Sequence, residues 1–337
     1  MSARVLVARL DNDGDVLLAG PAIRAVATGG AHVTLLCGPR GRQAAALLPG
    51  VEDVIVRRAE WIDPHPDPVE RAAIDAFVDE LAAGRFDEAI VLSSFHQSPL
   101  PLALLLRMAG VPRIAATSVD YPGSLLDVRH RIHDDVHEVE RSLSLVATLG
   151  HALPEGDDGA LRVRRPGDAP LGAGYVVVHP GASVPARAWA PERNAELVTA
   201  LGAEGRRVVV TGAPSERDLT ALVAGRSGID LGGRTDFAGL ADVLANAACV
   251  VVGNTGPAHL AAAVGTPVVS LYAPTVPPVR WRPWRVPHEL LYVDVPCAGC
   301  RARECPVPGH PCLGGVGVTD VTAAVARLAP QTRAVAA

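Results

Sequence analysis

Short apolar runs that do not alternate with polar residues recur along this chain, and they restrict its fold more than any other feature. Each run is followed by a loop marked by Gly or Pro and then by a helical pattern. Strands that are buried on both faces of a parallel sheet have this character, because helices cover both faces. The pattern therefore predicts an α/β fold. The runs of the first half are Val5–Ala8, Val33–Cys37, Asp53–Val56, Ala89–Leu92 and Arg113–Ala116, with helical stretches at Val16–Ala27, Val69–Ala83 and Leu100–Ala109.

The regular pattern loosens from about Asp120 to Pro170 and then restarts. One helix is predicted near His137–Leu149, and the Gly-, Asp- and Pro-rich sequence after it is the best candidate for a linker. The runs of the second half are Tyr175–His179, Arg207–Thr211, Cys249–Val252 and Pro267–Leu271, with helices near Pro191–Ala203, Glu216–Ala224, Leu240–Ala247 and Pro257–Val264.

A chain of 337 residues is long for a single hydrophobic core. We therefore predict two doubly wound, Rossmann-like domains, residues 1–165 and 166–337, that face each other across a cleft. The closing helix, at about Val318–Ala329, can pack on either domain.

The charge balance argues against two classes of partner. Lys and Arg total 31 against 36 Asp and Glu, which gives a net charge of −5. No positive field of the whole molecule therefore attracts nucleic acid or anionic lipid. The N-terminal apolar run is too short for a signal-peptide core or a membrane span, so we expect a cytoplasmic protein without an integral membrane segment.

Three carboxylates follow the first predicted strand, in the segment from Leu10 to Asp15. Ligands bind at the carboxyl ends of parallel strands, and Asp11, Asp13 and Asp15 crowd together at such an end. Mutual repulsion raises the pKa of a carboxylate and suits it to act as a base. The alternative is that one or two of them only cap the following helix. A calcium loop is excluded, because its spacing would put Arg9 in the first ligand position.

A second loop follows the predicted strand that ends at His179, and it contains Pro180, Gly181 and then Arg187. Small residues let the backbone approach a ligand closely, and the planar guanidinium of Arg187 matches a phosphate. The alternative for Arg187 is a solvated surface side chain. We favour the phosphate role, because two other loops of the same kind are suited to anions.

The third loop is the most informative, because a strand, a Gly-containing turn and a Pro in the first helical turn follow one another. A helix N-terminus combines free N–H groups with a positive dipole end, and here Thr255 and Gly256 present main-chain N–H groups to a diphosphate. His259 lies within the first turn, where it either touches a ligand or is only packed and hydrogen-bonded. The loop reads Gly253-Asn254-Thr255-Gly256-Pro257-Ala258-His259.

The chain has neither a G-x-G-x-x-G turn after its first strand nor a Walker A loop, which argues against nicotinamide enzymes and P-loop nucleotide hydrolases. Four ordered segments instead resemble the heptosyltransferases of glycosyltransferase family 9, whose fold is GT-B. The resemblance covers nearly the whole chain. The segments are Val5–Arg24 with Gly14-Asp15-Val16, His137–Arg141, His179-Pro180-Gly181 with Trp189, and Asn254–Pro274 with Thr255–Ala263 and Gly265-Thr266-Pro267.

The resemblance implies an inverting, metal-independent transfer of a sugar from a nucleotide-diphosphate sugar, usually ADP-heptose, to a sugar hydroxyl of lipopolysaccharide core. No cofactor is implied. The N-terminal domain then binds the acceptor and the C-terminal domain binds the donor, and peripheral contact with a membrane stays open. At the matching positions, Asp15 is the base that deprotonates the acceptor hydroxyl and Arg187 meets the diphosphate. The donor loop supplies Asn254, Thr255, Gly256, Pro257 and His259, and Glu216 is a weaker candidate for contact with the ribose.

Two features depart from the family pattern. Asn254 stands where the family commonly has Asp, which leaves the identity of the donor open. Asp11 and Asp13 occupy positions that are usually filled by small polar residues, so they add negative charge on the acceptor side. Such charge suits an acceptor glycan or glycoside that carries amines or cations better than it suits a phosphorylated core.

Four cysteines lie close together late in the chain, at Cys297, Cys300, Cys305 and Cys312, with His310 among them. Soft ligands at this density are suited to zinc or to an iron–sulfur cluster. The spacing matches no standard zinc finger, however, and free thiols or a disulfide are the alternative. No metal enters the catalytic prediction.

Two other functions stay open at this point. A sugar-nucleotide 2-epimerase of GT-B fold binds the same kind of donor and converts it without an acceptor. A non-catalytic nucleotide-sugar binding protein uses Asp15 only as a helix cap, so its Asp15→Ala variant would behave like the wild type.

Overall fold

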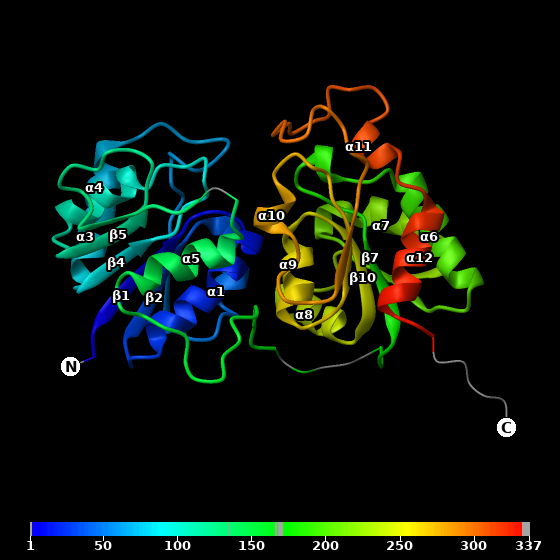
Figure 1. Ribbon diagram of the computed structural model, residues 1–337, viewed down its shortest axis with the longest axis horizontal. Coiled ribbons are helices and arrows are strands. Elements are labelled where there is room, and N and C mark those ends of the chain that lie inside the picture. The colour runs from blue at the N-terminus through cyan, green and yellow to red at the C-terminus, as the bar shows by residue number, and fades with distance from the viewer. Residues whose placement is uncertain (1, 134, 166, 168–170, 332–337) are drawn as a thin grey trace. The chain divides into compact units, whose positions relative to one another are not determined.

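A computed structural model describes residues 2–133, 135–165, 167 and 171–331 of the chain. The chain separates into two compact units, Met1–Arg164 and Arg165–Ala337. Each unit is built around one parallel β-sheet with helices on both of its faces (Figure 1).

The sheet of the first unit has the strand order β3-β2-β1-β4-β5-β6, and every neighbouring pair is parallel. Its described strands are β1 (Arg4–Arg9), β2 (His32–Cys37), β3 (Asp53–Val56), β4 (Glu88–Val91), β5 (Arg113–Thr117) and β6 (Val128–His130). Its described α-helices are α1 (Asp13–Ala27), α2 (Arg42–Ala45), α3 (Arg71–Ala83), α4 (Leu100–Met108) and α5 (Glu138–Ala147).

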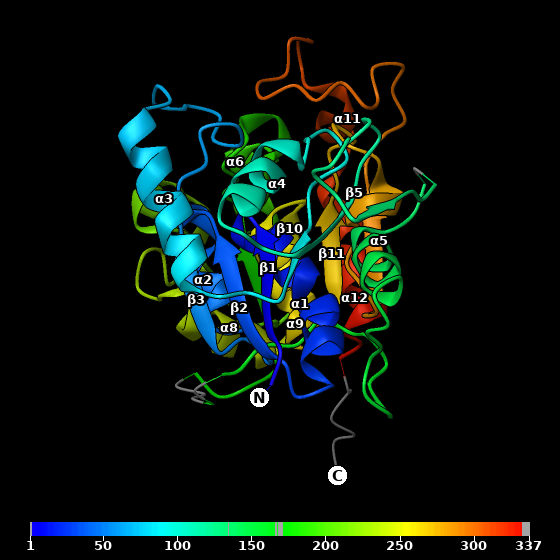
Figure 2. The ribbon, with the colours of Figure 1, turned by 90° about the vertical axis from the view of Figure 1, so that its left-hand side faces the viewer.

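Alternate residues of β1 bury side chains on opposite faces of this sheet. Leu6 and Ala8 belong to the core under α3 and α4, and α3 lies in front of the strands in Figure 2. Val5 and Val7 point to the other face, against which α1 packs beside α5. Burying a side chain such as Leu6 stabilises the fold by about 1.5–3 kcal/mol. Burial on both faces explains why β1 reads as an uninterrupted apolar run.

The sheet of the second unit has the order β12-β11-β10-β7-β8-β9, again with parallel neighbours. Its described strands are β7 (Tyr175–His179), β8 (Val208–Val210), β9 (Gly228–Asp230), β10 (Ala247–Gly253), β11 (Val268–Leu271) and β12 (His288–Leu291). Its described helices are α6 (Pro191–Ala203), α7 (Arg217–Ala224), α8 (Phe237–Ala245), α9 (Gly256–Ala263), α10 (Pro278–Trp281), α11 (Pro311–Gly314) and α12 (Val318–Leu328), with 3-10 turns η2 (Pro185–Arg187) and η3 (Pro214–Glu216).

Two helical layers enclose the second sheet. Helices α6, α7 and α12 pack on one face, and α8 and α9 lie on the other (Figure 1). The closing helix α12 inserts Val321, Ala324 and Val325 into the core beneath α6. Of the two domains on which this helix was expected to pack, the structure therefore places it on the second.

The predicted fold class, α/β with two Rossmann-like domains, is confirmed. Every predicted apolar run lies in a strand, and the strands that the sequence pattern missed are β6, β9 and β12. These three are short edge strands whose residues are largely half-buried, so they lack the apolar run that marks a central strand. The short helices α2, α10 and α11 were missed because four residues carry no helical period.

Candidate functional site

The strand order places a topological switch point in each sheet. In the first sheet β1 lies beside β4, and in the second β7 lies beside β10, so the segments that follow these paired strands leave in opposite directions. A crevice forms at the carboxyl ends of such strands, and ligands of doubly wound folds bind there. The predicted loops follow β1, β7 and β10, so all three lie at a switch point.

One buried arginine organises the switch point of the first unit. Arg9 is the last residue of β1 and is only 2% exposed. Its Nε lies 3.0 Å from Asp11 Oδ2, its Nη2 lies 3.0 Å from Asp15 Oδ1, and its Nη1 lies 3.6 Å from Glu138 Oε2. Burial alone would lower the pKa of Arg9, but these three carboxylates raise it above its ordinary value. Arg9 therefore stays charged.

Asp11 is held inside this site rather than presented at the surface. It is 7% exposed, and Ser94 Oγ donates to its Oδ2 at 3.3 Å. Gln97 Nε2 donates to its other carboxylate oxygen, while Arg9 Nη2 donates to Ser94 Oγ at 2.8 Å. Burial raises the pKa of Asp11, and the charge of Arg9 opposes that shift.

Asp15 differs from the other two carboxylates that pair with Arg9. Its side chain is 19% exposed, against 8% for Asp11 and 1% for Glu138. It lies in the first turn of α1, directly after the loop that leaves β1. Of these three carboxylates, Asp15 is therefore the most accessible to a substrate.

Asp13 is part-buried at the start of α1, where its Oδ1 accepts a hydrogen bond from the Ala44 N–H at 2.9 Å. Burial raises the pKa of Asp13 to about 6, although the Ala44 amide opposes the shift. The ordinary value is 3.8, so the folded chain binds more protons than the unfolded chain between these two pH values. Ionising Asp13 above pH 6 therefore costs stability.

We expect the Asp13→Asn variant to unfold less readily than the wild type at neutral pH, because the amide avoids that cost and still accepts from Ala44. The gain in the free energy of unfolding is about 1–3 kcal/mol at pH 7.5 and smaller at pH 4. Urea denaturation at both pH values measures it, with the exposed Asp79→Asn as the matched control. An equal or larger gain at pH 4 would contradict the assignment.

Glu138 reaches Arg9 from the N-terminus of α5. The His137 side chain accepts from the Val139 N–H at 3.2 Å, and the Glu140 side chain accepts from the His137 N–H at 3.2 Å. This capping box fixes where α5 begins, and α5 packs along α1. The first helical residue, Glu138, is therefore aimed at the switch point.

In the second unit, Arg187 connects the loops that follow β10 and β11. It ends the turn η2 and is half-buried. Its Nε donates to Thr275 Oγ1 at 3.3 Å, and its Nη1 donates to the Asn254 carbonyl at 3.5 Å. A Cβ atom on Gly253 would lie 2.7 Å from the Arg187 carbonyl oxygen, so only glycine permits this close approach of the two loops.

The predicted donor loop forms the start of α9. Thr255, Gly256 and Pro257 are half-buried there, with Thr255 as the N-cap residue. The Thr255 N–H donates to the Gly253 carbonyl at 2.8 Å, within the turn that precedes α9. His259 is 6% exposed and lies on the buried side of the first turn.

Asn254 is also buried, with 6% of its surface exposed, and its Nδ2 donates to the Ala273 carbonyl at 3.2 Å. The amide therefore links the ends of β10 and β11. It lies beside the Arg187 guanidinium, to which its main-chain carbonyl is hydrogen-bonded.

Glu216 lies against the loop that follows β7. Its Oε2 accepts from the Ala213 N–H at 2.7 Å, and a Cβ on Gly181 would lie 2.1 Å from its Oε1. Gly181 therefore leaves room for this carboxylate. Nearby, His179 Nδ1 lies 3.0 Å from Thr211 Oγ1, and burial lowers the pKa of His179 although Glu216 opposes that shift.

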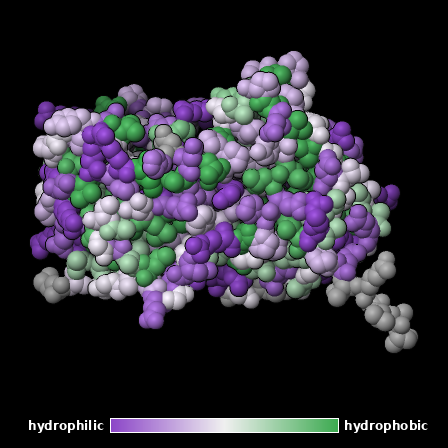
Figure 3. Space-filling view, in the orientation of Figure 1, coloured by the Kyte–Doolittle hydropathy of each residue, from purple (hydrophilic) through white to green (hydrophobic). Residues whose placement is uncertain are grey.

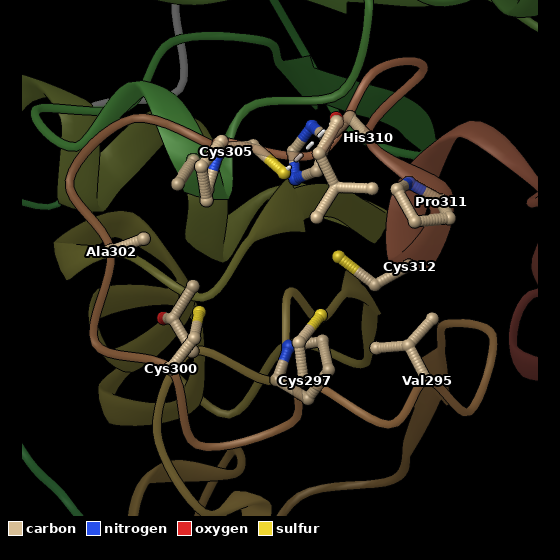
Figure 4. Close-up of a pocket in the computed structure, with 13 residues that line it drawn as sticks. Val295, Cys297, Cys300, Ala302, Cys305, His310, Pro311 and Cys312 are labelled. Carbon is tan, nitrogen blue, oxygen red and sulfur yellow. Dashed lines mark hydrogen bonds between the residues drawn. The ribbon is translucent and has the colours of Figure 1, made fainter.

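The four clustered cysteines line one hollow, together with His310 and Thr275 (Figure 4). All four cysteines are free thiols, and Cys312 is the buried one. Three main-chain hydrogen bonds join the surrounding segment to the loops after β7 and β11: Ala186 N–H to Arg303 O at 2.9 Å, Arg301 N–H to Thr275 O at 2.9 Å, and Gly299 N–H to Pro274 O at 2.7 Å. Within the described residues, no three His, Cys, Asp or Glu side chains are arranged to hold a metal ion.

The surface and the helices add two observations. Hydrophilic and hydrophobic residues are interspersed over the face in Figure 3. None of the helices in the described part of the chain is long and apolar enough to cross a membrane.

Sequence reasoning missed several residues that the structure brings to these loops, namely Arg9, Ser94, Gln97, Glu138 and Thr275. Two signals were present. Arg9 is a charged residue at the end of an otherwise apolar run, and Ser94 follows the β4 run as Asp11 follows that of β1.

Residues 74–310 match the sequence model of "Glycosyltransferase family 9 (heptosyltransferase)". Lipopolysaccharide heptosyltransferase 3 of Escherichia coli (strain K12) is 34% identical over 163 residues, which cover 44% of this chain and 47% of that protein. The match thus spans about half the length of that relative. Lipopolysaccharide heptosyltransferase 1 of the same strain is 30% identical over 286 residues, 81% of this chain and 89% of that protein.

A solved structure extends the likeness to the fold of nearly the whole chain. The E. coli heptosyltransferase WaaC with ADP-2-deoxy-2-fluoro heptose superposes with a TM-score of 0.73 at 24% identity, and the alignment covers 95% of this chain and 98% of that one. The likeness shows that both chains share one fold.

Proposed function

We propose, from the premise that this chain belongs to glycosyltransferase family 9, that it transfers heptose from ADP-heptose to a sugar hydroxyl of an acceptor glycan or glycoside. The transfer is inverting and needs no metal. The observation that carries the proposal is the position of Arg187, whose guanidinium connects the start of α9 with the loop after β11 at a switch point. The ADP-heptose analogue bound by the similar WaaC structure supports this choice of donor.

The donor side supplies positive potential for a leaving diphosphate. Arg187 offers the planar fork that binds phosphate oxygens, and the N-terminus of α9 adds the positive end of a helix dipole. Together they stabilise the charge that develops on the diphosphate as its bond to the sugar breaks. Glu216, packed beside Gly181, is our candidate for the ribose hydroxyls.

The acceptor side supplies a base. Asp15 takes the proton of the acceptor hydroxyl as that oxygen attacks the anomeric carbon, and the bond from this carbon to the diphosphate breaks. ADP leaves, and a single displacement inverts the anomeric centre. No metal-bound step is required, because Arg187 and the helix terminus provide the charge that the leaving group needs.

The acceptor site is negative, which bears on the class of acceptor. Asp11, Asp15 and Glu138 pair with the single guanidinium of Arg9, and Asp13 adds a further carboxylate at the start of α1. Even with Asp11 protonated, carboxylates outnumber this cation. The balance favours a neutral or amine-bearing acceptor over a phosphorylated one.

A thermal-shift panel of ADP, UDP, GDP and dTDP, each with its available sugars, tests the donor. We expect ADP and ADP-heptose to raise the melting temperature, because a ligand at 100 times its Kd stabilises by about 2.7 kcal/mol. Selective stabilisation by another nucleotide would overturn the donor, and no response to any would favour a non-catalytic role.

Incubation of the chain with ADP-heptose alone tests the class of reaction. A transferase consumes the donor productively only when an acceptor is added, whereas a 2-epimerase converts the nucleotide sugar without one. Conversion to an epimer in the absence of acceptor would reject glycosyl transfer.

A further inference from the structure

We propose that Arg9 and Glu138 are positioning residues that hold the Asp15 carboxylate in the orientation a base requires. The inference rests on the proposed function, because it assigns these residues a task in the same reaction. The observation behind it is that the Arg9 guanidinium, at the end of β1, pairs with both Asp15 of α1 and Glu138 of α5.

Arg9 is a rigid anchor for this task. Its backbone lies in β1, between β2 and β4, and its side chain is buried. The guanidinium is planar, and it donates hydrogen bonds to Asp15 and Ser94 and forms ion pairs with Asp11 and Glu138. The Nη2 group alone contacts both Asp15 Oδ1, at 3.0 Å, and Ser94 Oγ, at 2.8 Å. Asp15 is therefore tied to the carboxyl end of the central strand β1.

Glu138 completes the anchor from the opposite side. Its side chain is 1% exposed, and a carboxylate so buried is costly unless a cation pairs with it. The ion pair of 3.6 Å with Nη1 places a negative charge beside the second arm of the guanidinium, which favours the orientation in which the first arm meets Asp15. The capping box at His137 and the packing of α5 on α1 in turn hold Glu138 in place.

The two residues affect the base in opposite electrostatic senses. Arg9 favours the ionised carboxylate, whereas Glu138 and Asp11 disfavour it, because like charges repel. Arg9 from β1 pairs with Asp15, and Asp11 from the following loop and Glu138 from α5 pair with the same guanidinium. Asp13 follows on α1 itself, and His96, after β4, acts on Asp11.

The pH profile of kcat separates positioning from a merely structural role, since its acid limb reports protonation of the base. In Glu138→Gln, a nearby negative charge is lost, so the acid limb moves to lower pH by about half a unit or more. In Arg9→Lys, the charge remains but the fork is lost, so kcat falls about tenfold with little change in donor KM. The exposed Glu80→Gln on α3 is the matched control and keeps the wild-type profile.

Each outcome decides one question. ADP-induced thermal shifts in all variants show whether the chain still folds. If Arg9→Lys does not fold, the isosteric Glu138→Gln alone tests the positioning role. Transfer by every variant with the wild-type kcat and an unmoved acid limb would overturn the positioning role while the proposed function stands. No transfer by the wild type itself, with any donor and acceptor, would overturn the proposed function instead.

Discussion

The Asp15→Asn variant is expected to lose glycosyl transfer by about 10²–10⁴-fold in kcat while its affinity for ADP stays unchanged. Asn has the same shape, and its side-chain oxygen can still accept from Arg9, but it cannot take the acceptor proton. Asp15 is the most exposed of the carboxylates that pair with Arg9, so its replacement removes the base with the least disturbance of the buried pairs. Steady-state transfer and calorimetric titration with ADP measure the two quantities.

The control for this prediction is Asp79→Asn, an exposed substitution of the same kind on α3. It should transfer sugar at the wild-type rate. Asp15→Ala tests the loss of the side chain as a whole, and we expect it to be inactive too. Full activity in either Asp15 variant would reject the mechanism and leave Asp15 with only its structural contact to Arg9.

The fold was predictable because its central strands are buried on both faces. Such strands carry mostly apolar residues on both sides, so β1, β7 and β10 stand out in the sequence as apolar runs. The edge strands β6 and β9 pair on one side only and stay half-buried, which removes the signal. The pattern records runs of apolar residues, so the exposed edge strand β3, with the sequence DVIV, was still found, whereas β6 (VRH) and β9 (GID) were not.

The candidate site was predictable to the extent that it follows from strand ends. Asp15 and Arg187 come from loops after β1 and β7, and the rule for doubly wound sheets brings such loops to switch points. Arg9 and Glu138 were missed because their pairing depends on how α5 packs beside α1, which no local pattern encodes. The Thr255 N–H, which the sequence assigns to a diphosphate, is hydrogen-bonded to the Gly253 carbonyl within its own turn, and its contact with a ligand stays a prediction.

The Arg187→Ala variant is expected to bind ADP more weakly by about 1.5–3 kcal/mol, which is roughly 10- to 150-fold in Kd. Charge-assisted hydrogen bonds to a phosphate are lost, and the charge that remains on the diphosphate is then poorly neutralised. Because the same charge grows as the sugar departs, kcat with the nucleotide sugar should fall as well. Calorimetric titration gives the affinity, and steady-state kinetics give kcat and KM.

The binding loss should depend on the phosphates and not on the nucleoside. Adenosine lacks the diphosphate, so its weak binding should be the same in Arg187→Ala and in the wild type, whereas ADP should lose affinity. The exposed Arg226→Ala in the same unit removes one positive charge away from the loops and should leave both ligands unaffected. An equal loss for adenosine and ADP would mean that the substitution has loosened the contact with Asn254 and Thr275, and Arg187 would then be a packing residue of these loops.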